Sequence, residues 1–291
     1  MKNTVLILFL FTIGINYSQS KKELIDTISK SEMLESDCVG IGCEEGQQYL
    51  NFKKLKKLIT EKELTELTKN ENPFLRMYAS IELIDSDKGN VVDLFKYELN
   101  KKDTIARIQG CIIQDEPTYS IIYDYYRGKI FFKVYDEDLS VEETQQKQES
   151  LILADKNLDS IDKIIINSKD DLNWLLYNRA FEFRKYSGKD LERVAELAFE
   201  KNNSYALLYL KFSHSKSYNS KIDSYLKNDF VTANFNSVNG IFYLHSIIEY
   251  LLDSENDEYK NIAIKKLKTD DSWKSEKASF ENTLMKYNIE L

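Results

Sequence analysis

The stretch from Thr60 to Asp85, TEKELTELTKNENPFLRMYASIELID, most constrains the fold of this chain. Thr60 and Glu63 form a capping box, which marks the start of a first helix. Asn72 is a preferred N-cap, and Pro73 suits the first position of a second helix. This second helix is apolar on nearly every side, so we expect neighbours around it. A helix pair of this kind cannot bury its apolar surface alone, and it predicts further pairs.

Residues that break helices are scarce, because the chain has 2 Pro and 9 Gly in 291 residues. An all-β fold needs many more turns of that kind. Apolar residues recur at helical spacing in 46–59, in 90–112, where Asp103 is expected to cap a helix containing Ile105 and Ile108, and throughout 161–288. We therefore predict an all-α fold of antiparallel helix pairs, stacked as an α-α superhelix.

The segment ELTELTKNENPFLRMYASIEL resembles a HEAT-type repeat, in which a leucine-striped helix and a polar turn precede Pro, an aliphatic residue, Arg and Ala. In this chain those positions are Pro73, Leu75, Arg76 and Ala79. The family usually has an Asp in the turn, where this chain has Glu71 and Asn72. The resemblance covers 46–113, in which 90–112 is a weaker copy with Arg107 but no Pro. It implies an α-solenoid used as a binding scaffold, with the four matching residues packed between repeats and Arg76 bonded to a neighbouring repeat.

A tyrosine-rich stretch occupies residues 119–138. We favour a helix here, although a β-hairpin around Arg127 and Gly128 remains open, since short apolar runs are ambiguous by periodicity. Tyrosine offers a large rigid contact area with a polar tip and is enriched at interfaces. The sequence therefore makes this stretch a candidate partner surface, and packing between repeats is the alternative. The candidate residues are Tyr119, Tyr123 and Tyr126.

The N-terminus has the pattern of a secretory signal peptide. Lys2 precedes an apolar run, Val5–Ile15, of 11 residues, whereas a membrane-spanning helix needs roughly 20. Small residues follow at Ser18 and Ser20. We predict that residues 1–18 are a signal peptide, that 19–291 form one helical-repeat domain, and that the protein is periplasmic or secreted with no membrane insertion after the signal is removed.

Three cysteines follow the predicted signal: Cys38, Cys43 and Cys111. An exported chain meets an oxidising compartment, where disulfides persist. Glycines within CVGIGC let the chain fold back, which favours a Cys38–Cys43 disulfide and leaves Cys111 free and buried. The odd number of cysteines also permits the two other single pairings.

The charge balance excludes one large class of partner. The chain has 40 Lys and Arg against 48 Asp and Glu, a net charge of −8. Nucleic-acid recognition needs a basic face, so we do not expect a nucleic-acid ligand. The segment Asp155-x-Asn157-x-Asp159 is similar to the start of a calcium loop, but Ser160 stands where that loop needs Gly. We predict neither a metal nor another cofactor.

No arrangement of nucleophile, base and acid can be assigned from the sequence. His245 and Glu249 lie four residues apart and can share a helix face, but a general base also needs a nucleophile or water within reach. We predict a non-catalytic exported scaffold that binds a protein or peptide partner. One alternative is an immunity or inhibitor-like protein that neutralises a basic toxin or enzyme. Another is a hydrolase that uses His245 and Glu249.

Overall fold

A computed structural model of the protein describes residues 19–134, 139–237 and 239–290. The predicted signal peptide, residues 1–18, therefore lies outside the described residues.

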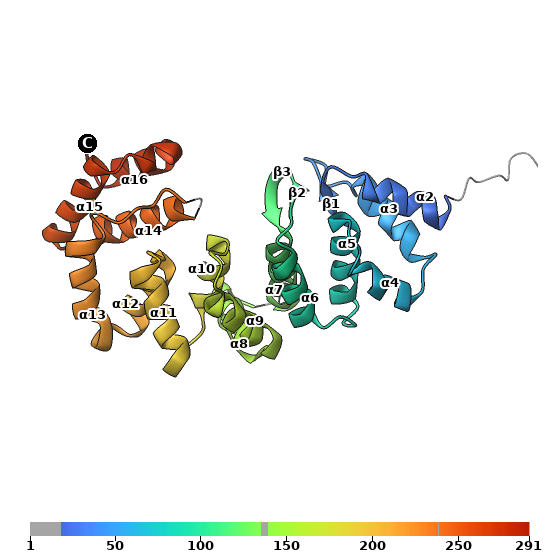
Figure 1. Ribbon diagram of the computed structural model, residues 1–291, viewed down its shortest axis with the longest axis horizontal. Coiled ribbons are helices and arrows are strands. Elements are labelled where there is room, and N and C mark those ends of the chain that lie inside the picture. Colours follow the sequence, from blue (N-terminus) through green and yellow to red (C-terminus); the bar gives the residue numbers. More distant parts are fainter. Residues whose placement is uncertain (1–18, 135–138, 238, 291) are drawn as a thin grey trace, which may run out of the picture. The chain divides into compact units, whose positions relative to one another are not determined.

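The chain separates into two compact units, Met1–Tyr126 and Arg127–Leu291, which we call unit 1 and unit 2. Figure 1 shows that helices make up most of both units, as the sequence predicts. The segments expected to carry helix pairs, 46–113 and 161–288, fall in different units. Each unit is therefore described by itself.

Unit 1 combines helices with a small sheet. Its helices are α2 (Lys21–Ser29), α3 (Gln47–Lys56), α4 (Glu61–Leu67), α5 (Pro73–Asp85), α6 (Val91–Lys101) and the first part of α7 (Thr118–Phe131). Its core is built mainly from aliphatic and aromatic residues of these helices, among them Leu24, Phe52, Leu55, Met77, Phe95 and Ile122.

The helix pair α4 and α5 begins at the predicted residues. The Thr60 hydroxyl accepts a hydrogen bond from the Glu63 amide, and the Glu63 carboxylate accepts one from the Thr60 amide. The Asn72 side chain accepts hydrogen bonds from the first two free amides of α5, each at 3.1 Å. These contacts satisfy donors that a helix start leaves without partners. Both predicted N-caps are confirmed.

Unit 1 also contains a three-stranded sheet in the order β1-β2-β3. The strands are β1 (Leu34–Val39), β2 (Thr104–Gly110) and β3 (Ile112–Pro117). β1 pairs with β2 in parallel, and β2 pairs with β3 as an antiparallel hairpin. The sequence analysis did not predict β1, which ends at the first two residues of CVGIGC.

The predicted helix after Asp103 is wrong, because β2 and the start of β3 occupy that segment. The Gln109–Ile112 pair closes the hairpin and leaves two turn residues, of which Gly110 has a φ of +57°. Glycine adopts this backbone conformation without a Cβ clash. The β-branched isoleucines of the segment suit a pleated strand. Segment 90–112 thus has one helix, α6, where a second helix pair was expected.

The tyrosine-rich stretch is helical up to Phe131, as favoured from the sequence. The hairpin alternative is wrong, because Arg127 and Gly128 lie inside α7. A short 3-10 helix, η1 (Phe132–Val134), follows. The end of the stretch, residues 135–138, lies outside the described residues.

The described residues of unit 2 form helices and the loops that connect them, without a strand. Its α-helices after α7 are α8 (Val141–Ala154), α9 (Lys156–Asn167), α10 (Trp174–Glu182), α11 (Gly188–Glu200), α12 (Ser204–Ser213), α13 (Ser215–Ser224), α14 (Gly240–Asp253), α15 (Asp257–Thr269) and α16 (Lys277–Lys286). Short turns of other helix types are η2 (Tyr225–Asp229) and η3 (Ser272–Glu276). None of the described helices of either unit combines the length and apolar composition that crossing a bilayer requires.

Candidate functional site

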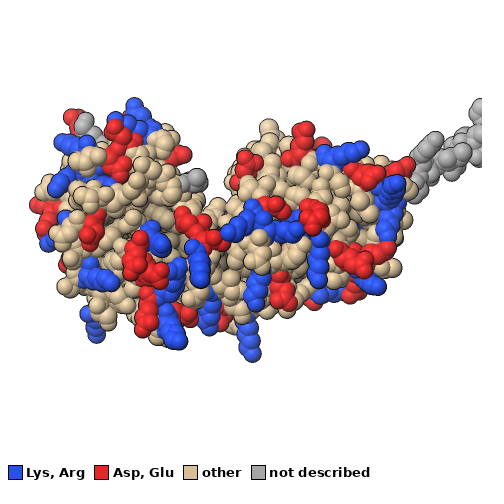
Figure 2. Space-filling view, viewed as in Figure 1, with Lys and Arg blue, Asp and Glu red and all other residues tan. Residues whose placement is uncertain are grey.

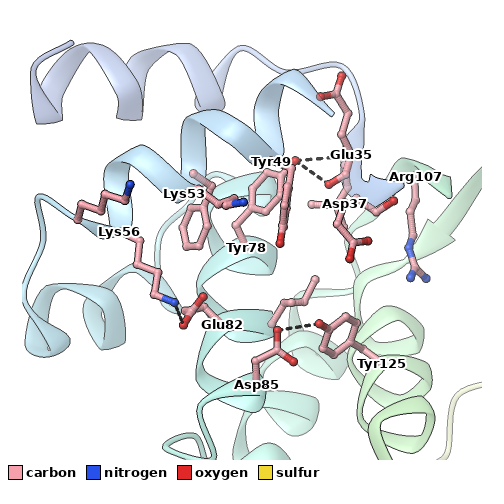
Figure 3. Close-up of a pocket in the computed structure, with 15 residues that line it drawn as sticks. Glu35, Asp37, Tyr49, Lys53, Lys56, Tyr78, Glu82, Asp85, Arg107 and Tyr125 are labelled. Carbon is pink, nitrogen blue, oxygen red and sulfur yellow. Dashed lines mark hydrogen bonds and ion pairs between the residues drawn. The ribbon is translucent and has the colours of Figure 1, made fainter. Parts of the chain in front are cut away.

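Unit 1 contains a cavity of about 390 Å³ that opens beside the sheet. Four elements supply most of its walls: β1, α3, α5 and the unit 1 part of α7. Figure 3 shows three tyrosines and several charged side chains around this space. We call it the tyrosine pocket, and its aromatic lining consists of Tyr49, Phe52, Tyr78 and Tyr125.

The inner wall of the tyrosine pocket is held by Tyr78. This side chain is buried, and its ring stacks on Phe52 with the ring centres 5.2 Å apart. The Tyr78 hydroxyl accepts a hydrogen bond from the Glu35 amide at 3.1 Å and donates one to the Glu35 carbonyl at 3.0 Å. Burial raises the pKa of Tyr78 above its ordinary value, so the phenol stays protonated. Tyr78 therefore fixes β1 against α5.

Two further tyrosines form the polar side of the pocket. The Tyr125 hydroxyl donates a hydrogen bond to the Asp85 carboxylate at 2.8 Å (Figure 3). Burial and this carboxylate raise the pKa of Tyr125. Burial also raises the pKa of Tyr49, and the negative charge of Asp37 adds to the effect. Carboxylates therefore lie near both phenols, Asp85 beside Tyr125 and Asp37 beside Tyr49.

Most cations around the tyrosine pocket already have an acidic partner. Lys53 pairs with Glu45 at 2.6 Å, Lys56 pairs with Glu82, and Arg107 pairs with Glu116 at 3.1 Å. Across the described residues, neither Asp37 nor Lys57 forms an ion pair.

The site offers rings and an open carboxylate rather than a reactive group. Aromatic faces attract cations, and an Asp carboxylate accepts hydrogen bonds from ammonium or guanidinium groups. A lysine or arginine side chain can lay its aliphatic stem on the rings and bring its charge to Asp37. Within the described part of the chain, no group of three His, Cys, Asp or Glu side chains is arranged to hold a metal ion.

His245 and Glu249 lie in unit 2, where a third polar side chain joins them. His245 Nε2 lies 2.9 Å from Thr283 Oγ1, and His245 Nδ1 lies 3.8 Å from the Glu249 carboxylate. Thr283 is buried in α16, and the His245 and Phe280 rings meet edge to face with their centres 4.8 Å apart. A nucleophile must be open to substrate, whereas this hydroxyl is enclosed between α14 and α16. These contacts fit polar packing between α14 and α16 better than a catalytic group.

The cysteines lie at one end of the unit 1 sheet. Cys38 and Cys43 are joined by a disulfide, the pairing favoured from the sequence. Cys111 is free but exposed, so the prediction that it is buried is wrong. It occupies the hairpin turn beside Gly110, and a turn at the end of a two-stranded ribbon has no layer above it.

The three candidate tyrosines do not form an exposed surface. Tyr119 and Tyr123 are buried, and both rings contact Phe95 of α6 with centres 6.3 and 6.4 Å away. Tyr126 is half-buried. The partner-surface interpretation is therefore wrong for Tyr119 and Tyr123, because α7 packs that face against α6. The same stretch supplies Tyr125, which sequence reasoning did not single out, to the tyrosine pocket.

The other pocket residues also carried no sequence signal. Asp37, Tyr49 and Asp85 belong to β1, α3 and α5, and no motif links them. The four HEAT-type positions lie elsewhere in α5, at its start and on its buried faces. Comparison with protein families found no matching family model, and comparisons with curated proteins and with solved structures found no significant match.

Proposed function

We propose that this protein is a non-catalytic binding protein whose unit 1 takes a Lys or Arg side chain of a partner protein into the tyrosine pocket. The observation that carries the proposal is the unpaired carboxylate of Asp37 at a cavity walled by aromatic rings. A pocket of about 390 Å³ accommodates one long side chain. Lys53, Lys56 and Arg107 are paired with other carboxylates, so none of these three forms an ion pair with Asp37.

Calorimetry with short peptides tests this proposal. The peptides share one sequence and differ at a central Lys, Arg, Leu or Glu. We expect the Lys and Arg peptides to bind and the Glu peptide to bind least. The substitution Asp37→Asn should weaken binding of the Lys peptide about two- to fivefold, as for an exposed ion pair. The substitution Tyr125→Ala should weaken it about tenfold by removing a ring and its contact area.

A matched control separates the pocket from general charge effects. Asp26 is an exposed acid on α2 that does not line the pocket. Asp26→Asn makes the same change of charge and should leave peptide affinity unchanged. Equal binding of the Lys, Leu and Glu peptides, or equal losses in Asp37→Asn and Asp26→Asn, would contradict a cation-selective pocket.

A narrower form of this function is neutralisation of a basic toxin or enzyme. The net charge of −8 favours it, because opposite charges accelerate association and discriminate against acidic partners. A photo-cross-linking residue in place of Lys57, which is exposed and lines the pocket, should capture the partner in cells. Tight binding to one basic protein that weakens steeply with salt supports neutralisation, whereas several salt-insensitive partners support a general scaffold.

The architecture and the compartment are part of the same proposal. We infer a HEAT-like stack from the resemblance and from two helix pairs, α4–α5 and α11–α12, whose second helices are each capped by an Asn side chain. Small-angle scattering that fits a compact sphere would contradict such a stack. We infer export from the N-terminal pattern, and mass spectrometry of the mature N-terminus tests it, with cleavage near Ser18 or Ser20 as the expected result.

A further inference from the structure

The two outer strands of the unit 1 sheet differ in how their edges are protected. The outer edge of β1 is covered, because its Glu35 backbone bonds to the Tyr78 hydroxyl. Farther along β1, Val39 and Glu44 exchange hydrogen bonds of 2.8 and 3.1 Å. An uncovered strand edge is a template for pairing with another chain, and proteins usually block it. β1 is therefore closed to an added strand.

The outer edge of β3 has no such cover. In the described part of the chain, β3 pairs only with β2. The turn closes on the pair Gln109–Ile112, so the peptide groups of Ile113 and Asp115 point away from β2. Residues 112–115 are exposed, and the isoleucines at 112 and 113 are 67% and 59% exposed. A strand exposed on both faces and along one edge can accept another strand.

The disulfide loop adds a third exposed isoleucine at this end of the sheet. The Gly40 amide donates a hydrogen bond of 2.8 Å to the Gly110 carbonyl and ties the loop to the hairpin turn. Ile41, within the loop, is 98% exposed. We call Ile41, Ile112 and Ile113 the apolar tip. Figure 2 shows mostly uncharged atoms at the end of the sheet, at the top of unit 1, with acidic atoms beside them.

The segment that carries the disulfide loop is rich in acidic residues. Residues 31–46 contain five Asp or Glu and no Lys or Arg. Asp115 is exposed on β3, on the same face as Ile113, because residues two apart on a strand share a face. Two copies of this chain would bring like charges together at such an interface, which disfavours a second copy as the occupant. The surface instead complements a segment that is apolar and basic.

We propose that β3 binds an extended segment of a partner protein as an added strand. An apolar residue of that segment lies on Ile113, and a Lys or Arg two positions away lies on Asp115. Main-chain hydrogen bonds to the outer edge supply affinity, and alternate side chains supply specificity, as in other cases of strand addition. This site goes beyond the tyrosine pocket and does not depend on it, because Ile113 and Asp115 do not line that pocket.

Selection of random ten-residue peptides displayed on phage against the full chain tests the proposal. We expect enrichment of an apolar residue and a Lys or Arg at a spacing of two. Reversing the charge with Asp115→Lys should change the selected basic residue to Asp or Glu at the same spacing. Asp26→Lys, the matched charge reversal on α2, and Asp37→Asn, in the tyrosine pocket, should leave this spacing and preference unchanged.

Binding of one selected peptide then measures the contributions of charge and edge. Asp115→Asn should weaken it about two- to fivefold, as expected for a cross-strand charge pair. Ile113→Lys, which places a lysine on the open edge, should weaken it more than tenfold without changing the circular dichroism spectrum. A consensus that survives Asp115→Lys would overturn the proposal. The proposal would also be overturned if light scattering showed a dimer that dissociates on Ile113→Lys, because the β3 edge would then bind a second copy of this chain.

Discussion

Each unit is held together by a buried arginine, but the two units enclose it differently. In unit 1, Arg76 makes a two-fold contact with the Glu98 carboxylate at 2.9 and 3.2 Å and also pairs with Asp103. In unit 2, Arg184 pairs with Asp162 at 2.8 Å. Arg76 also donates to two backbone carbonyls in the α4–α5 turn, and Arg184 donates to two at the end of α8.

The two units differ in how many arginine side chains bond to the ends of their helices. Arg76 is fully buried and ties the turn before α5 to α6 through its side chain. Two partly exposed side chains of α6 also reach this turn, since Tyr97 bonds to the Lys69 carbonyl and Lys101 pairs with Glu71. Arg184 is 8% exposed, and Arg193 binds the end of the adjacent α9 through the carbonyls of Ile166 and Ser168. The guanidinium group suits both sites, since its planar set of donors reaches several acceptors at once. In unit 1 a single arginine makes the fully buried contacts, whereas in unit 2 two arginines share the contacts to α8 and α9.

The largest effect is expected for Arg76→Met, which removes the cation and leaves the Glu98 carboxylate buried. Loss of one partner of a buried ion pair costs about 3–5 kcal/mol in the free energy of unfolding. Urea unfolding followed by circular dichroism measures the loss. Hydrogen exchange should localise it, with faster exchange in α5 and α6 and unchanged exchange in α9 and α10.

A second substitution shows whether the cost comes from the charge left behind. Arg76→Met combined with Glu98→Leu leaves no buried carboxylate, so it should recover part of the lost stability. An Arg76→Met protein as stable as the parent would show that the packing of unit 1 does not depend on this ion pair.

Arg184→Met is expected to cost less, about 2–3 kcal/mol, because Asp162 loses its arginine while Arg193 still binds the end of α9. The faster hydrogen exchange should appear in α8 and α9. Both arginines contact α9, Arg184 through Asp162 and Arg193 through backbone carbonyls at its end. Combining Arg184→Met with Arg193→Met should therefore destabilise unit 2 by more than the sum of the two single changes. Simple additivity would show that they act independently.

The parts of the fold that sequence reasoning identified are those set by neighbouring residues. Asn72 and Pro73 determine the start of α5 through contacts within three residues, so their pattern is visible in the sequence. β1 was missed because its partner is distant in the sequence: Leu34 of β1 faces Arg107 of β2. The isoleucines at 105, 108 and 112 are spaced as on one face of a helix, and the pairing of β2 with β1 and β3 overrode this pattern.

The candidate site was less accessible to sequence reasoning than the fold. Asp37, Tyr49 and Tyr125 meet only after β1, α3 and α7 have packed. The abundance of tyrosine near residue 125 drew attention to the correct helix but to its buried face, since Tyr123 packs on Phe95. Exposure alternates around a helix, and which face is buried depends on neighbours that composition does not reveal.

The Cys38–Cys43 disulfide constrains the end of the unit 1 sheet and does not take part in the arginine contacts. The bond joins residues five positions apart, so in the loop-entropy account its loss costs about 2 kcal/mol or less. Replacing both cysteines by serine should leave hydrogen exchange in α5 and α6 unchanged. It should loosen the Gly40–Gly110 contact. It should also lower the affinity of the selected peptide for β3, which calorimetry measures. Unchanged peptide affinity would separate the disulfide loop from binding.

Loss of the exposed ion pair between Lys21 and Glu63 in unit 1 should change the free energy of unfolding least. It therefore tests whether burial is what makes the arginine contacts strong. The Lys21 ammonium, helped by the Thr60 amide and hydroxyl, lowers the pKa of Glu63 from 4.5 to about 2. A lowered folded-state pKa contributes stability above pH 4.5, and this contribution is lost as the pH falls toward 2. Glu63→Gln keeps the capping-box geometry, so the stability difference from the parent should be constant above pH 5 and shrink below it.

Because this pair is open to solvent, added salt should diminish the difference, whereas the cost of Arg76→Met should change little. A salt-insensitive Glu63 effect as large as that of Arg76→Met would contradict the view that burial distinguishes the two.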